Sequence, residues 1–259
     1  MTLSDPFIQA LLEKIDSPDV IAVGMVGSYA RGQESKYSDV DLDIYVSQLP
    51  ENPYDRYTLR YWDKKLVSLK YALLEDERLG LSNPRRAIWV APGLQGMRIL
   101  LDKDGSLAEL QNVAQHFDFS LLQREADEYA AEQIMGNAEE VHKILNGLAR
   151  SHESTVLYAT WGLVKNILEA VAVQRGILII SENRYFELIQ ESVGRDTKWT
   201  RAFRTAWGLD PHASQYQSRG AAALMLYRLT AAMFDGLIPE RHREVVSHTL
   251  RLIKEAGYE

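Results

Sequence analysis

The sequence predicts an α+β fold in which a small mixed β-sheet domain is followed by an all-helical bundle domain. Alternating or continuous apolar runs typical of strands occur only before about residue 105, and helical periodicity dominates after it. No Ser/Gly-rich linker separates the two halves. We therefore predict a first domain at residues 1–117 and a second at residues 118–259.

The first domain begins with a predicted helix, because Ser4 can cap it and Pro6 suits its first turn. Strands are expected at residues 19–26, 40–46, 66–74 and 97–101. The second strand alternates strictly, so Asp39, Asp41 and Asp43 share one face and the apolar residues share the other. A sheet of four or five strands follows from these segments.

The second domain is expected to be entirely helical, and a helix at the end of the first domain precedes it. The apolar spacing predicts helices at residues 106–117, 121–149, 154–175, 182–193, 198–207, 214–235 and 240–256. Gly176, Gly194, Pro211 and Pro239 mark expected breaks between them.

Composition excludes several classes of protein. The 259 residues are 46% hydrophobic and 25% charged, which rules out a largely disordered chain. A formal net charge of -7 argues against stable nucleic-acid binding, and the absence of cysteine excludes disulfides and thiolate chemistry. The N-terminus lacks a secretory signal, and charged residues interrupt the most apolar stretch, residues 157–180. We expect a cytoplasmic protein without a membrane span.

The most informative segment is residues 27–46, GSYARGQESKYSDVDLDIYV. Gly27 and Ser28 end a predicted strand, and a glycine there lets a phosphate approach the backbone. Asp39 and Asp41 lie two residues apart on one strand face, where Mg²⁺ would relieve their mutual repulsion. The pattern predicts a triphosphate cradle beside a Mg²⁺ site, and the alternative is a solvated polar strand face.

The motif G-S-x-A-R-G, followed by S-D-x-D on a strand, resembles the DNA polymerase β-like nucleotidyltransferase superfamily. The resemblance implies that Gly27 and Ser28 bind a nucleoside triphosphate, and that Asp39 and Asp41 are catalytic Mg²⁺ ligands. The two-domain layout is similar to that of the aminoglycoside and lincosamide nucleotidyltransferases. It implies transfer of a nucleoside monophosphate to a hydroxyl of a small-molecule acceptor, such as an antibiotic. Arg31 is expected either to contact phosphate or to anchor its own loop.

One departure from the family pattern concerns a third carboxylate, which many members carry on the next strand. Ser68 stands where that acid is expected. Asp43, Glu75 and Asp76 are the candidate substitutes, and Asp43 is more readily interpreted as a residue behind the metal ligands. The missing acid motivates an alternative, a nucleotide-binding regulatory module with little turnover.

The helical half is expected to supply a general base and a cation for the pyrophosphate. Glu139 and Lys143 lie one helical turn apart. A resemblance to kanamycin-type nucleotidyltransferases implies that Glu139 is the base and that Lys143 binds the triphosphate. The alternative is an ordinary surface ion pair. A rival stripe on the next predicted helix consists of Tyr158, Gly162, Lys165 and Glu169.

The acceptor itself is left open by the sequence. The acidic run near residues 125–140 is interpreted as a solvated helix face or as a site for a cationic acceptor such as an aminoglycoside. A further alternative is modification of a protein or a tRNA in a toxin–antitoxin pair, although the acidic net charge weighs against RNA. The nucleotide base is also open, as is the choice between a monomer and a homodimer with a shared site.

Overall fold

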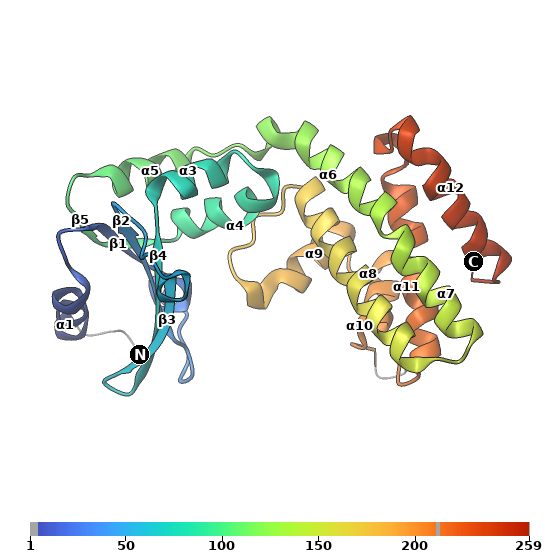
Figure 1. Cartoon of the computed structure of the whole chain (residues 1–259), viewed down its shortest axis with the longest axis horizontal. Helices are drawn as coiled ribbons and strands as arrows, with labels where there is room; N and C mark the ends of the chain where they lie inside the picture. Colours follow the sequence, from blue (N-terminus) through green and yellow to red (C-terminus); the bar gives the residue numbers. More distant parts are fainter. Residues whose placement is uncertain (1–4, 211–212, 259) are drawn as a thin grey trace. The chain divides into compact units, whose positions relative to one another are not determined.

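A computed structural model describes residues 5–210 and 213–258 of the chain. The chain forms two compact units (Figure 1). The N-terminal unit extends to Phe119 and also includes Leu178–Glu182, whereas the helical unit consists of Ser120–Ile177 and the residues from Asn183 onward. The expected cap Ser4 and the expected break Pro211 lie outside the described residues.

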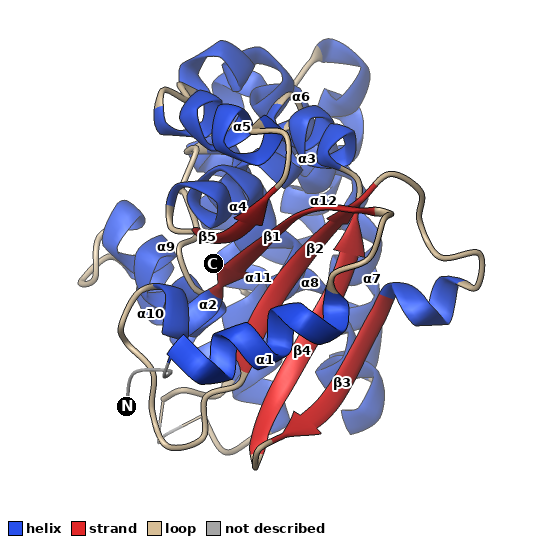
Figure 2. Ribbon diagram, turned by 90° about the vertical axis from the view of Figure 1, so that its left-hand side faces the viewer, coloured by secondary structure: helices blue, strands red, loops and turns tan. Residues whose placement is uncertain are grey.

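The N-terminal unit is built on one five-stranded mixed sheet, which confirms the predicted fold class (Figure 2). Its strand order is β3-β4-β2-β1-β5. Only β2 and β4 pair in parallel, whereas the other neighbours are antiparallel. The strands are β1 (Val20–Val26), β2 (Val40–Val46), β3 (Tyr57–Trp62), β4 (Lys65–Ala72) and β5 (Arg98–Asp102).

Helices cover both faces of this sheet, because its central strands carry apolar side chains on both sides. Helix α1 (Asp5–Ile15) packs Phe7, Leu11 and Ile15 against the face that presents Val40, Leu42 and Ile44. On the opposite face, Tyr45 and Ala22 meet the remaining helices of the unit. These are α3 (Leu74–Leu81), α4 (Pro84–Gln95) and α5 (Ser106–Gln115).

Three elements were missing from the sequence prediction: the edge strand β3 and the helices α3 and α4. Helix α4 contains Pro92, which has no N–H to donate to the Ile88 carbonyl one turn earlier. That carbonyl instead accepts a hydrogen bond of 2.7 Å from Ile179 N. The return of residues 178–182 to the N-terminal unit therefore satisfies a backbone group that the proline leaves open.

The helical unit contains α6 (Gln123–Gly136), α7 (Ala138–Ala149), α8 (Glu153–Gln174), α9 (Tyr185–Val193), α10 (Lys198–Trp207), α11 (Tyr216–Met233) and α12 (Glu240–Glu255). Short 3-10 turns at Phe119–Leu122, Glu182–Arg184 and Asp235–Leu237 connect some of them, while Pro53–Arg56 precedes β3. The helix predicted at residues 121–149 is two helices, separated at the buried Asn137. The Asn137 amide donates to Gln133 O at 2.7 Å and accepts from Asn166 at 3.1 Å.

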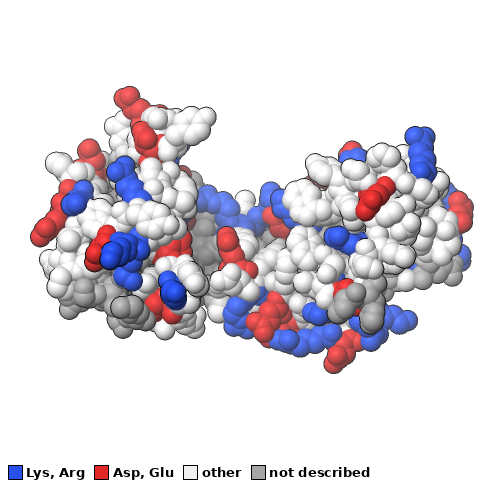
Figure 3. Space-filling view, turned by 90° about the horizontal axis from the view of Figure 1, so that it is seen from below, with Lys and Arg blue, Asp and Glu red and all other residues white. Residues whose placement is uncertain are grey.

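Helix α8 is the central element of the helical unit. By length and composition it is the one described helix that could cross a membrane, yet 61% of its most apolar window is buried inside the protein. Its apolar character is that of a core helix. Charged side chains of both signs are interspersed over the face of the molecule shown in Figure 3, without an extended field of one sign.

Candidate functional site

The turn after β1 brings the backbone against a carboxylate of β2. Gly27 begins the four-residue helix α2 (Gly27–Ala30) with a φ of +71°. A Cβ at Gly27 would lie 2.2 Å from Asp41 Oδ2, so a side chain cannot be placed there without moving that carboxylate. The Ser28 carbonyl accepts from Gln33 N at 2.9 Å and closes the turn. The positive φ and the close approach to Asp41 both require glycine at position 27.

The two predicted metal ligands stand at the start of β2. Strand β1 pairs Val26 with Asp41, and Asp39 immediately precedes β2. Burial, and after it the negative charge of Asp39, raises the pKa of Asp41 to about 6 against opposing effects from Ser68 and Arg31. The structure therefore places Asp39 and Arg31 close enough to the Asp41 carboxylate to interact with it electrostatically.

This donor set fits Mg²⁺ bound together with a substrate. Mg²⁺ prefers oxygen ligands and is commonly held by one or two carboxylates, with phosphate oxygens and water completing its shell. Asp39 and Asp41 supply such a carboxylate pair, and the negative charge of Asp39, after burial, raises the pKa of Asp41, a repulsion that a bound cation would relieve. No group of three or more His, Cys, Asp or Glu that could hold a metal occurs in the part of the chain that the structure describes.

The position expected for the third carboxylate is occupied by a buried hydroxyl. The parallel register of β2 and β4 places Ser68 directly beside Asp41. Ser68 is buried, and its hydroxyl hydrogen-bonds to the Asp41 carboxylate. Ser68 thus favours the charged form of the neighbouring carboxylate and contributes no charge of its own.

Asp43 is already engaged by a cation. Lys70 lies beside it on β4, with Nζ 3.7 Å from Asp43 Oδ1 and 2.9 Å from Glu77 Oε1. Burial raises the pKa of Asp43, while Lys70 opposes that change. Burial by itself would lower the pKa of Lys70, but the two carboxylates raise it overall. This network favours the interpretation of Asp43 as a residue behind the ligands.

The other two candidate acids belong to α3. Glu75 is exposed and lies 3.7 Å from Arg78 Nε, and the Asp76 carbonyl accepts from Arg86. Glu77, which the sequence reasoning missed, is the buried acid of this helix. The available signal was its position three residues after Leu74 and four before Leu81, on the side of α3 that contains the buried Leu81.

Comparisons with known proteins agree with this geometry. Residues 7–90 match the model of a family described as "Nucleotidyltransferase domain". A curated protein of Methanocaldococcus jannaschii, named "Putative protein adenylyltransferase MJ1305", is 31% identical over 106 residues, which are 39% of this chain and 70% of the relative.

The chain belongs to the polymerase β-like nucleotidyltransferase superfamily.

This nucleotidyltransferase also matches the crystal structure of a nucleotidyltransferase-like protein from Exiguobacterium sibiricum 255-15. The match covers 96% of this chain and 79% of that chain, at 13% identity and a TM-score of 0.49.

In the helical unit of the nucleotidyltransferase, Lys143 contacts two acids of α7. Its Nζ lies 2.9 Å from Glu139 Oε1 and 3.0 Å from Glu140 Oε1. The Glu139 side chain is 75% exposed, whereas that of Glu140 is 19% exposed. The hydrogen bond from Lys143 lowers the pKa of Glu139. The roles of Glu139 and Lys143 in catalysis stay predictions.

Glu140 is the acid of this cluster that points inward. Its Oε2 is buried and has no hydrogen-bond partner among the described residues, and a Cβ at Gly162 of α8 would lie 3.6 Å from it. Sequence reasoning missed Glu140, although the buried Ile144 and Gly147 follow it at helical spacing. Other members of the rival stripe are engaged elsewhere: Tyr158 packs beside Trp161, and Lys165 Nζ lies 5.6 Å from the Trp161 ring centroid.

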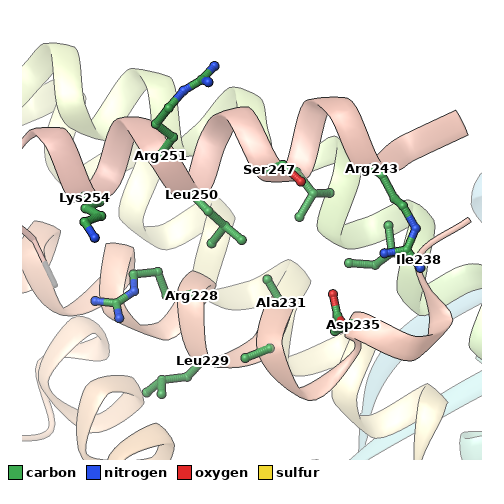
Figure 4. A pocket seen from close by; sticks show the side chains of 12 residues that line it. Arg228, Leu229, Ala231, Asp235, Ile238, Arg243, Ser247, Leu250, Arg251 and Lys254 are labelled. Carbon is green, nitrogen blue, oxygen red and sulfur yellow. The ribbon is translucent and has the colours of Figure 1, made fainter. Parts of the chain in front are cut away.

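A basic groove of about 800 Å³ runs between α11 and α12 (Figure 4). Its cationic residues are Arg228, Arg243, Arg251 and Lys254, and its acid is Asp235. Figure 4 shows Arg228 and Lys254 toward one end, and Arg243 near Asp235 at the other. A groove with this charge disfavours a cationic ligand.

The acidic run of α6 and α7 is paired with cations. Arg124 contacts Glu125 and Glu128, with Nη1 3.1 Å from Glu128 Oε1. Arg241 Nη2 lies 3.9 Å from Glu132 Oε1, and Lys143 neutralises the acids at the start of α7. These pairs favour a solvated helix face over a site for an aminoglycoside.

Proposed function

We propose that this nucleotidyltransferase transfers AMP from ATP to a hydroxyl of a protein side chain in a Mg²⁺-dependent reaction. The observation that carries the nucleotide half is the close approach of the Gly27 backbone to Asp41 beside Asp39. The adenine and the protein acceptor are supported by the name of the Methanocaldococcus jannaschii relative, a protein adenylyltransferase. The chain covers 70% of that relative, and their similarity extends over 39% of this chain.

In the N-terminal unit, different residues would bind the metal ion and the triphosphate. Asp39 and Asp41 would hold Mg²⁺, which when bound neutralises charge on the triphosphate. Gly27 leaves room for the β- and γ-phosphates, and the Ser28 hydroxyl is available to donate to them. Arg31, which already acts on Asp41 electrostatically, adds positive charge to the same end of the sheet.

The reaction balances without a further reactant. The acceptor oxygen forms a bond to the α-phosphorus as the bond between that phosphorus and the bridging oxygen breaks, and pyrophosphate leaves. The hydroxyl proton passes to a general base, for which Glu139 is the sequence-based candidate and Glu140 is the less exposed alternative. Lys143 is expected to stabilise the negative charge of the triphosphate as pyrophosphate leaves.

A small-molecule acceptor is the second candidate. The groove between α11 and α12 has a volume of about 800 Å³, within the range of small-ligand sites. Its cations favour an anionic alcohol over an aminoglycoside. Cytoplasmic location and a shared site in a homodimer stay predictions.

The proposed function is tested by transfer of label from α-³²P-ATP. Wild-type protein is incubated with Mg²⁺ and either an array of peptides, each with one Tyr, Ser or Thr, or a panel of phosphorylated and aminoglycoside alcohols. We expect wild-type protein to label peptides and Asp41→Asn to lose this labelling. Glu139→Gln and Glu140→Gln are then compared, and the variant with the larger loss of rate identifies the general base. Labelling of the alcohols alone would contradict a protein acceptor. Tight Mg²⁺–ATP binding without any transfer would favour the regulatory module.

A further inference from the structure

Strand β3 carries a row of exposed apolar side chains. Tyr57, Leu59 and Tyr61, here called the β3 ridge, are 56%, 53% and 80% exposed. They alternate along the strand and therefore share one face. Large aromatic and aliphatic side chains gathered on an exposed strand are typical of an interaction surface.

The β3 ridge lies on the same face of the sheet as the catalytic carboxylates. Asp41 pairs with Ser68 on β4, and Ser68 pairs with Leu59 on β3. In the next row, Asp43 pairs with Lys70, and Lys70 pairs with Tyr57. Residues opposite each other in neighbouring strands present their side chains on one face. Two strand spacings place the ridge about 10 Å from the carboxylate row.

The position of the phosphate turn indicates the side from which an acceptor approaches. Gly27 follows β1, which borders β2 on one side, while β4 and β3 lie on the other side. In phosphoryl transfer the attacking and leaving oxygens are roughly in line with the phosphorus. With pyrophosphate held beside Gly27, the acceptor oxygen arrives from the side of β4, and thus from the direction of the β3 ridge.

We propose that the β3 ridge docks the protein acceptor, with an extended segment of that protein lying along β3 and presenting its hydroxyl toward Asp41. The inference rests on the protein acceptor proposed above. The ridge is about 13 Å long and projects into solvent, which suits a polypeptide better than a small molecule that needs a concave site. The cavity beside β3 is lined by Thr58, Arg60 and Trp62 of the opposite face, and Tyr61 is the one ridge residue that also borders it.

Two further features of β3 favour an extended, acidic polypeptide. As an edge strand, β3 has outward backbone N–H and C=O groups available to pair with an added strand. The hairpin from Asp55 to Lys65 contains four Lys or Arg and two Asp, in a chain whose net charge is -7. An acceptor segment that combines apolar residues with nearby carboxylates would complement both the ridge and this local charge.

The test compares a ridge variant with a control on the other face of the same strand. The ridge variant combines Tyr57→Thr, Leu59→Thr and Tyr61→Thr, because threonine keeps a high strand propensity while removing most apolar surface. The control is Thr58→Ala, which changes a side chain on the opposite face of the same strand and leaves the charge of the hairpin intact. Each protein is assayed on 15-residue peptides with a central Tyr, Ser or Thr in alternating apolar and acidic sequences, using α-³²P-ATP. Mg²⁺–ATP affinity is measured in parallel by calorimetry.

We expect the ridge variant to label these peptides about tenfold more slowly or worse, with unchanged Mg²⁺–ATP affinity, and the control to remain within about twofold of wild type. Equal labelling by the ridge variant would overturn the ridge as the docking site and leave the protein acceptor standing. No labelled peptide with the wild type would overturn the protein acceptor and the ridge together. Weakened ATP binding by the ridge variant would instead mean that the ridge contacts the adenine of ATP. If the wild type is a dimer and the ridge variant a monomer, the ridge binds a second copy of the chain.

Discussion

Replacing Gly27 with alanine should affect both the stability of the protein and the position of the Asp41 carboxylate. The residue has a φ of +71°, and an added Cβ would lie 2.2 Å from Asp41 Oδ2. The first property costs stability, because an L-residue in the left-handed region is disfavoured by about 1–2 kcal/mol. The second property affects the metal ligand, because ordinary van der Waals contact begins near 3.4 Å.

Gly32 provides a matched control for this substitution. Its φ is +64°, and nothing lies within 4 Å of a Cβ added there. Gly27→Ala and Gly32→Ala should therefore both lower the free energy of unfolding by about 1–2 kcal/mol. Only Gly27→Ala must also move the Asp41 carboxylate, by about 1 Å, and misplacement on that scale can cost about 100-fold in catalysis.

The two effects are measured separately. Urea denaturation gives the free energy of unfolding of each variant, and isothermal titration calorimetry gives its affinity for Mg²⁺–ATP. We expect similar destabilisation of both variants, and a loss of affinity of about tenfold or more in Gly27→Ala alone. Equal Mg²⁺–ATP affinity of the two variants would refute the assignment of Gly27 and Asp41 to one nucleotide site.

Three further substitutions test the surroundings of the site and the helical core. Glu77→Gln should lower the free energy of unfolding by about 1–2 kcal/mol because Glu77 is a buried carboxylate paired with the half-exposed Lys70. The exposed Glu75→Gln should change it by less than about 0.5 kcal/mol in the same denaturant titrations. Ser68→Asp should lower the melting temperature of the Mg²⁺-free protein, since it buries a second negative charge beside Asp41, and added Mg²⁺ should restore it. In the control Ser68→Ala, Mg²⁺ should produce no such recovery. Thr230→Val removes the acceptor 2.8 Å from Trp199 Nε1 and should cost about 1–3 kcal/mol by the same titrations.

Strand β2 shows what the sequence makes predictable. Its strict alternation separates the apolar face from the acids, and the structure buries Val40, Leu42 and Ile44 on one side while Asp41 faces the other. The pattern is reliable here because one face is covered by α1, so a shift by one residue would bury charge. The predicted strand and the shared face of its acids follow from local spacing alone.

The missed edge strand depends on information that spacing does not carry. Strand β3 alternates as well, but its apolar members face solvent and its turn to β4 lacks glycine. Asp63 and Lys64 instead adopt positive φ values of 44° and 63°, as a two-residue hairpin turn requires. The hairpin is stabilised by pairing with β4, a tertiary contact that turn propensities do not show.

The acids of the site also include some that local spacing predicts and others that depend on tertiary contacts. The alternation of β2 places Asp41 on the site face, whereas the pairing of Asp43 with Lys70 and Glu77 depends on the β2–β4 register and on α3. The four-residue spacing of Glu139 and Lys143 left a catalytic pair and a surface ion pair open; the structure contains the ion pair, and Glu140 shares Lys143, which the spacing did not show. Contacts within one element are readable from sequence, and contacts that depend on a neighbouring element are not.

The most direct test of the central claim is a thermal shift measurement with ATP, GTP, CTP and UTP, each with and without Mg²⁺. It compares wild-type protein with the double variant Asp39→Ala/Asp41→Ala. At 100 times the dissociation constant, a ligand that binds only the folded state adds about 2.7 kcal/mol of stability. We predict a Mg²⁺-dependent rise in melting temperature with ATP that the double variant loses. A rise of equal size in the double variant, or no rise with any nucleotide, would contradict a nucleotide site at these two carboxylates.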